Sequence, residues 1–81
     1  MMKFYFNLQT DDGLAEDPDG CDLGDLEAAC DEATRAAREI AAAAVKAGRE
    51  DAPSDILIAD ANGRVLAIVS LADMIPDRLR K

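Results

Sequence analysis

The stretch from Asp25 to Ala47, DLEAACDEATRAAREIAAAAVKA, decides the fold, and Gly48 follows it. Its apolar residues recur at steps of three and four, which places them along one stripe of an α-helix. The stripe consists of Leu26, Ala29, Cys30, Ala33, Ala37, Ile40, Ala41 and Ala44. Because most of these side chains are alanines, the helix offers a shallow surface on which a sheet packs closely. The sequence therefore predicts one long amphipathic helix lying on a β-sheet.

Both ends of this predicted helix carry capping signals. Asp22 or Asp25 can act as the N-cap, and we favour Asp25, which stands directly before the first apolar residue of the stripe. Gly48 suits the left-handed residue that follows a last helical turn. We therefore expect the helix to begin just after Asp25 and to end at Gly48.

Residues 3–9 alternate between two sets of side chains, as in a strand with one buried face. Phe4, Phe6 and Leu8 point to one side, and Tyr5 and Asn7 point to the other. All three aromatic residues of the chain lie in this segment, so the strand is expected to anchor the core.

Two turns separate this strand from the helix. Residues 10–13 form the first, and residues 14–16 are expected to return as a short second strand. Residues 17–20 form the second turn. Pro18 and two glycines then predict irregular structure up to residue 24.

Residues 55–70 predict a β-hairpin, and two registers of its turn are possible. A two-residue turn at Asn62 and Gly63 would pair Ala61 with Arg64. A type I turn opened by Asp60, with Gly63 in a bulge, would pair Asp60 with Arg64, and we favour this register.

The favoured register makes both faces of the hairpin apolar. Ile56, Ile58, Leu66 and Ile68 would meet the helix. Leu57, Ala59, Val65, Ala67 and Val69 would lie on the other face. Because one helix covers only one face, we expect a homodimer that buries part of this second face or pairs edge strands.

The predicted fold is an α+β domain with the order ββαββ. One long helix packs on an antiparallel sheet of four strands. A short helical turn begins after Ser70 and is limited by Pro76. With 81 residues, positions 1–81 are expected to form a single domain.

Acidic residues gather in one part of the chain. From Asp11 to Glu32 there are ten acidic residues and no Lys or Arg. We take five of them as a candidate acidic docking patch for a basic protein: Asp11, Asp12, Asp17, Asp19 and Asp22. An EF-hand calcium loop does not fit, because placing Gly20 at loop position 6 puts Ala15 at position 1 and Leu26 at position 12. Weak divalent-ion binding by Asp17, Asp19 and Asp22 remains an alternative.

Composition argues against several classes of function. A net charge of −8 without histidine argues against a nucleic-acid partner. The sequence offers no pair of a nucleophile and a base and no phosphate-binding loop. Acidic neighbours also disfavour the thiolate form of Cys21. We therefore expect that the protein is not an enzyme and binds no cofactor. Two cysteines without histidine do not make a zinc site. No apolar run is long enough for a membrane span and no signal peptide is evident, which favours a cytoplasmic protein without membrane contact.

Four motifs together resemble a family of small bacterial proteins described as a domain of unknown function. They are FYFNL at residues 4–8, D-x-x-G-x-x-L at 17–23, DLEAA at 25–29 and DANGR at 60–64. The resemblance implies two strands, a helix and two strands, and it implies no activity, cofactor or catalytic residue. Members of that family usually carry histidine at the position of Asn7, and this departure argues against a catalytic base on the first strand.

A looser similarity links the middle of the chain to the antitoxins of bacterial toxin–antitoxin pairs. In those proteins a short meander precedes an Asp/Leu/Glu/Ala helix start, and the acidic antitoxin neutralises a basic toxin. The similarity implies an acidic regulator that binds a basic protein. The first expectation from the sequence is nevertheless a small interaction or accessory protein.

Overall fold

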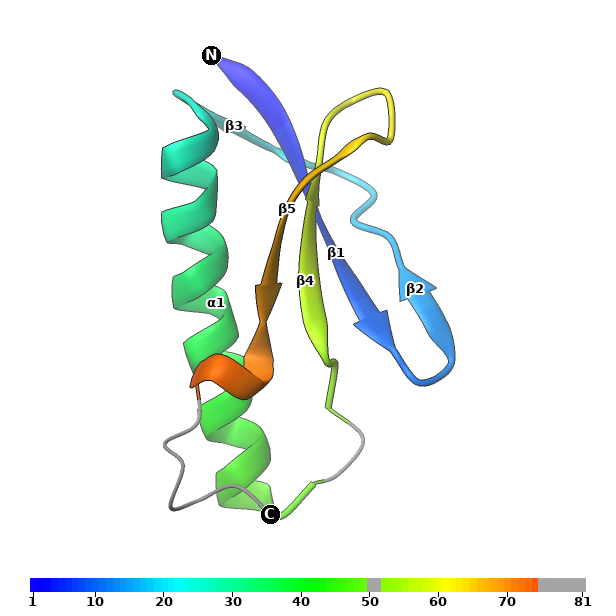
Figure 1. The fold of residues 1–81 in the computed structure, drawn as a ribbon, viewed down its shortest axis with the longest axis vertical. Helices are drawn as coiled ribbons and strands as arrows, with labels where there is room; N and C mark the ends of the chain where they lie inside the picture. The colour runs from blue at the N-terminus through cyan, green and yellow to red at the C-terminus, as the bar shows by residue number, and fades with distance from the viewer. Residues whose placement is uncertain (50–51, 75–81) are drawn as a thin grey trace.

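The computed structural model describes residues 1–49 and 52–74 as one helix packed on an antiparallel sheet (Figure 1). The elements are β1 Met2–Thr10, β2 Gly13–Ala15, β3 Cys21–Leu23, α1 Leu26–Ala47, β4 Asp55–Ala59, β5 Val65–Ser70 and the 3-10 helix η1 Leu71–Met74. The predicted α+β class is thereby confirmed, as is the short helical turn near the C-terminus. Pro76, expected to limit that turn, lies outside the described residues.

Helix α1 begins and ends where its caps predict. The Asp25 carboxylate accepts the Ala28 N–H at 2.8 Å, which satisfies one of the free donors at the helix start. Gly48 has φ 68° and its N–H donates to the Val45 carbonyl at 3.2 Å. Of the predicted stripe, Leu26 is the member that remains exposed, at 37%. The fully buried members are Ala29, Ala33, Ala37 and Ala41.

The sheet has five strands, one more than the sequence predicted. Its order is β2-β1-β4-β5, and β3 also pairs with β1. The prediction of irregular structure after residue 20 is wrong for Cys21–Leu23, which pairs with Met2–Phe4 of β1. This strand has only three residues, so it carries no alternation of its own. Pairing with the long strand β1 provides its hydrogen bonds instead.

The core lies between the alanine stripe of α1 and one face of the sheet. Phe4 of β1 and Ile56 and Ile58 of β4 have exposures of 1% or less and are the largest fully buried side chains. Phe6 and Leu8 pack against them, so the predicted buried face of β1 is confirmed. Leu71 of η1 closes one end of this core at 4% exposure.

The hairpin between β4 and β5 has the turn that the sequence favours but a different strand register. The Gly63 N–H donates to the Asp60 carbonyl, and the Asp60 N–H donates to the Arg64 carbonyl, each at 3.0 Å. Ala59 then pairs with Val65, whereas Ile58 pairs with Ala67. Leu66 is the extra residue of a β-bulge. From Ala67 onward, the side chains of β5 therefore lie on the opposite faces from those that the predicted register gave them.

We expect Ala33→Leu to lower the free energy of unfolding by about 1–2 kcal/mol. Ala33 is 1% exposed and faces the core, so a larger side chain would force the helix away from the sheet. Leucine is almost as good a helix former as alanine, so the helix itself is not weakened. Chemical denaturation measures the loss. Ala42→Leu, at an exposed position of the same helix, is the control. Equal effects of the two substitutions would contradict close packing at Ala33.

Candidate functional site

The outer face of the sheet lies opposite α1, and several of its apolar side chains are exposed. Cα pairing places Asn7, Leu57 and Ile68 in one row across β1, β4 and β5. Tyr5, Ala59 and Val65 form the next row. Leu14 of β2 pairs with Gln9 and therefore lies on the same face. The exposures are 62% for Ile68, 47% for Leu14 and 46% for Val65.

The predicted dimer face is only partly present in the structure. Leu57 and Val65 lie on the outer face as predicted, and Ala59 shares that face but is 2% exposed. Ala67 and Val69 pair with the buried residues Ile58 and Ile56 and pack against the core, so their predicted outward position is wrong. The bulge at Leu66 is the cause. It turns Ile68 outward in their place, so the prediction that Ile68 meets the helix is wrong. The sequence prediction also missed Leu14 as a member of this face.

Asp17 fastens the second turn to β1 with its carboxylate. One oxygen, Oδ2, accepts the Phe6 N–H at 3.2 Å, and the other, Oδ1, accepts the N–H groups of Asp19 at 3.1 Å and Gly20 at 3.2 Å. In return the Asn7 side-chain oxygen accepts the Asp17 N–H at 2.9 Å. We call this set of bonds the Asp17 clamp. It accounts for the D-x-x-G part of the motif at residues 17–23.

The clamp favours the charged form of the Asp17 carboxyl. Partial burial acts to raise its pKa, but the backbone N–H groups of Gly20, Phe6 and Asp19 outweigh burial and hold the pKa below the ordinary value of 3.8. The carboxylate is therefore ionised at neutral pH with its oxygens facing the three donors. This arrangement indicates a structural role for Asp17.

Gly20 lets the turn approach the outer face of β1. Its φ of +72° is a left-handed conformation that favours glycine. A Cβ atom at this position would lie 2.9 Å from Lys3 Cγ and 2.9 Å from Tyr5 Cε2. The turn therefore lies directly against the side chains of β1.

A shallow hollow of about 160 Å³ lies beside the clamp on the outer face. Its lining residues are Tyr5, Asn7, Glu16, Asp17, Ala59, Asp60, Ala61 and Gly63. Asp60 is bound within its own turn, because its Oδ1 accepts the N–H groups of Asn62 and Arg64, each at 2.9 Å. The carboxylates of Asp17 and Asp60 thus both accept hydrogen bonds from backbone N–H groups. The other ionisable side chains that line the hollow are those of Tyr5 and Glu16.

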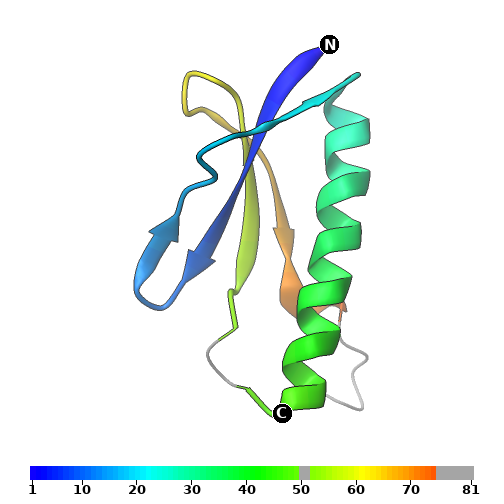
Figure 2. The ribbon, with the colours of Figure 1, turned by 180° about the vertical axis from the view of Figure 1, so that it is seen from behind.

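The predicted acidic docking patch does not form one cluster. Asp11 and Asp12 lie in the turn between β1 and β2, whereas Asp22 pairs with Lys3 near the other end of β1. These positions are about 23 Å apart along the strand. Asp19 is exposed like these three, but the Asp17 carboxylate is engaged in the clamp. The acids form two exposed groups along one edge of the sheet, and Figure 2 shows this edge from behind, from β2 to the start of α1.

The alternative of a divalent-ion site at Asp17, Asp19 and Asp22 gains no geometric support. Within residues 1–49 and 52–74, no three His, Cys, Asp or Glu side chains are grouped so that they could hold a metal ion. Cys21 is an exposed free thiol on β3, and Cys30 is a free, partly buried thiol that packs against the core.

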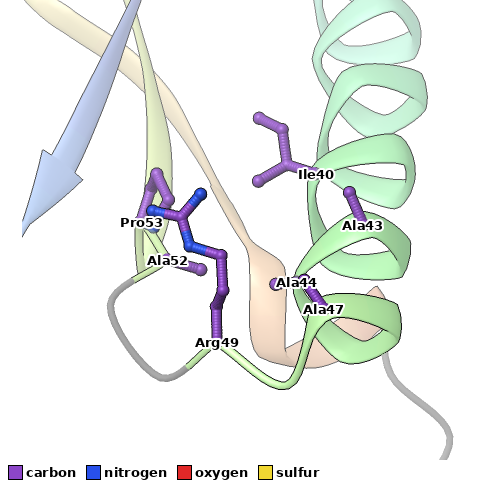
Figure 3. A pocket seen from close by; sticks show the side chains of 7 residues that line it. All are labelled: Ile40, Ala43, Ala44, Ala47, Arg49, Ala52 and Pro53. Atoms are coloured by element: carbon purple, nitrogen blue, oxygen red, sulfur yellow. The ribbon is translucent and has the colours of Figure 1, made fainter.

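A second hollow, of about 330 Å³, separates the last turns of α1 from the chain before β4 (Figure 3). Its lining is almost entirely apolar: Ile40, Ala43, Ala44, Ala47, Ala52 and Pro53, with Arg49. Figure 3 shows the Arg49 side chain extending across it toward Pro53. Its surface has the chemistry of a contact for an apolar side chain.

Comparison with known proteins identifies the chain at the level of a family model. The model for DUF6894, described as a domain of unknown function, matches residues 3–72. No curated protein and no solved structure matches the chain. In the part of the chain that is described, no helix has the length and apolar character needed to span a membrane.

Proposed function

The chain belongs to the DUF6894 family, a domain of unknown function, and we propose that it is a small non-catalytic interaction domain of the cytoplasm that acts as a homodimer. The observation that carries the proposal is the apolar part of the outer face at β4 and β5, where Val65 is 46% and Ile68 is 62% exposed. Apolar surface left in water is unfavourable, and contiguous apolar patches on soluble domains commonly mark contact surfaces.

The polar groups of the same region support a role without catalysis. Asp17 and Asp60 accept backbone N–H groups of their turns, and Asn7 accepts the Asp17 N–H. These side chains fix the turns that border the outer face. Their hydrogen bonds give Asp17, Asp60 and Asn7 a structural role, which supports an interaction domain more directly than a catalytic one.

The proposal predicts that Ile68→Asp weakens self-association strongly. The substitution replaces the most exposed apolar side chain of the outer face with a carboxylate, which is costly to bury in a contact. Sedimentation equilibrium should show the variant as a monomer at concentrations where the wild-type chain is a dimer. Ala42→Asp is the matched control, since it adds the same charge at an exposed position on α1. A wild-type chain that is monomeric at every concentration, or a dimer unaffected by Ile68→Asp, would contradict the proposal.

A second candidate is an acidic regulator that binds a basic protein, as antitoxins do. Asp11, Asp12, Asp19 and Asp22 are all exposed along the β2 and β3 edge, and the chain carries a net charge of −8. Such an edge attracts basic surfaces, and the attraction weakens with salt. Gentle purification at low salt would recover a basic protein that is released at high salt. Recovery of the homodimer alone would speak against this candidate.

A further inference from the structure

The two edges of the sheet differ in how their backbone hydrogen-bonding groups are satisfied. At the β1 edge, Met2–Phe4 pairs with β3 and Leu8–Thr10 pairs with β2. Between these two short pairings, the Phe6 N–H donates to the Asp17 carboxylate. The sheet therefore ends on this side in two strands of only three residues each, and short edge strands limit pairing with another chain. Figure 2 shows the segment from β2 through β3 to α1.

The β5 edge is open over the described part of the chain. β5 pairs with β4 on one side, and no described strand pairs with it on the other. Figure 1 shows β5 at the front of the sheet with no described segment drawn across it. Charged side chains and proline are the usual protection of an exposed edge, and Val65–Ser70 contains neither.

The strand register identifies the backbone groups that face outward. The Leu71 N–H donates to the Ser54 carbonyl at 3.0 Å, which continues the register in which Ser70 pairs with Asp55. In an antiparallel ladder the N–H and C=O groups of alternate residues point to the same neighbour. The backbone N–H and C=O groups of Val69 therefore point toward β4, as the N–H of Leu71 does. The N–H and C=O groups of Ile68 and Ser70 point to the open edge.

We propose that β5 pairs with β5 of a second copy, antiparallel and about a twofold axis, so that the two sheets join into one. This inference rests on the homodimer proposed above and specifies how its two copies meet. Ile68 of each copy would exchange backbone hydrogen bonds with Ser70 of the other. The two Ile68 side chains, each 62% exposed in the single chain, would then become diagonal neighbours on the continuous outer face.

Charge favours a second copy at this edge over a basic peptide. The net charge is −8, yet β5 contains no acidic residue, so two copies can approach here without bringing carboxylates of the strands together. A basic segment would be attracted to the acidic β2 and β3 edge, where the two edge strands have only three residues each and offer little backbone to pair with.

Two substitutions at Ile68 test the edge pairing by sedimentation equilibrium. Ile68→Pro removes the outward N–H and leaves the β4 ladder intact, since that N–H does not point toward β4. Losing one hydrogen bond per copy is expected to raise the dimer dissociation constant on the order of 30-fold. Ile68→Thr keeps the N–H and the β-branched shape, and we expect a dissociation constant within about 5-fold of the wild-type value.

Leu14→Asp separates edge pairing from face-to-face contact. Leu14 lies on the outer face at the opposite side of the sheet, on β2, so the edge dimer should retain its wild-type dissociation constant. A dimer that Leu14→Asp dissociates and Ile68→Pro leaves intact would overturn the edge pairing while supporting the homodimer. A wild-type chain that stays monomeric would overturn both.

If Ile68→Pro fails to fold, amide hydrogen exchange of the wild-type chain tests whether β5 pairs with β5 of a second copy. The pairing predicts that the N–H groups of Ile68 and Ser70 exchange slowly in concentrated solution and rapidly on dilution. The N–H of Val69, which points toward β4, should change much less and is the internal reference. Equal exchange of Ile68 and Ser70 at both concentrations, in a chain that is dimeric when concentrated, would overturn the proposal.

Discussion

Replacement of Asp17 with alanine is expected to lower the free energy of unfolding by about 3–4 kcal/mol. The substitution removes the acceptor of three backbone N–H groups, those of Phe6, Asp19 and Gly20. The loss is large for a chain of 81 residues, whose total stability is expected to be about 4–12 kcal/mol. Urea denaturation of the wild-type and variant chains measures it.

Asp19→Ala is the matched control, because it removes an equal charge from the same turn. The Asp19 side chain is exposed, and no hydrogen bond joins it to another side chain or backbone group in the part of the chain described. We expect a change within about 0.5 kcal/mol. Equal losses for the two substitutions would mean that the effect of Asp17 comes from charge and not from the clamp.

The pH dependence gives an independent test of the same clamp. Because the folded-state pKa of Asp17 lies below 3.8, the carboxylate contributes its full stability above that pH and loses it as the pH falls through the lowered pKa. The difference in stability between the wild-type chain and Asp17→Ala should therefore shrink in acid below about pH 4. A difference that stays constant from neutral pH to pH 2 would contradict the clamp.

Gly20→Ala is expected to cost about 2–4 kcal/mol, the second largest effect on stability. A left-handed conformation costs an alanine about 1–2 kcal/mol, and φ at Gly20 is +72°. The new Cβ would also lie 2.9 Å from carbons of Lys3 and Tyr5, so these side chains must shift. Thermal unfolding should show a decrease in Tm of roughly 10–25 °C.

Gly48→Ala separates the two causes of this loss. Gly48 has nearly the same φ, +68°, and its Cβ would meet no atom within 4 Å. Gly48→Ala is therefore expected to lose only the conformational part, about 1–2 kcal/mol. If Gly20→Ala is no more destabilising than Gly48→Ala, the close approach of the turn to β1 does not contribute.

The helix and the first strand were predictable because their signals are local. Asp25, the alanine stripe and Gly48 mark the start, the buried face and the end of α1 within one segment. The alternation of Phe4, Phe6 and Leu8 identifies the buried face of β1 in the same way. Side-chain periodicity and capping are properties of neighbouring residues, so one sequence is enough to read them.

The strand β3 and the Asp17 clamp were not predictable because both depend on a partner distant in sequence. Cys21–Leu23 is a strand only because Met2–Phe4 lies beside it. The acids from residue 11 to residue 22 suggested one docking patch, yet the Asp17 carboxylate is turned to the Phe6 N–H, eleven residues away. The sequence gives no sign that the Phe6 N–H lies in the gap between two short strands and needs a side-chain acceptor.

The outward face of β5 was mispredicted for a different reason. Val65 to Val69 is a continuous apolar run, so its alternation does not distinguish inward from outward positions. The single extra residue Leu66 determines which side chains of β5 face outward, and it turns Ile68 outward. The candidate contact surface was thus predictable as apolar, but its members were not.

The measurement that tests the central proposal most directly is sedimentation equilibrium of the wild-type chain over a range of concentrations. The chain has a mass of 8.6 kDa, and the proposed homodimer predicts a rise to twice that mass as the concentration increases. The rise should persist at high salt, because an apolar contact is not weakened by screening. A mass of 8.6 kDa at every concentration would contradict a homodimer.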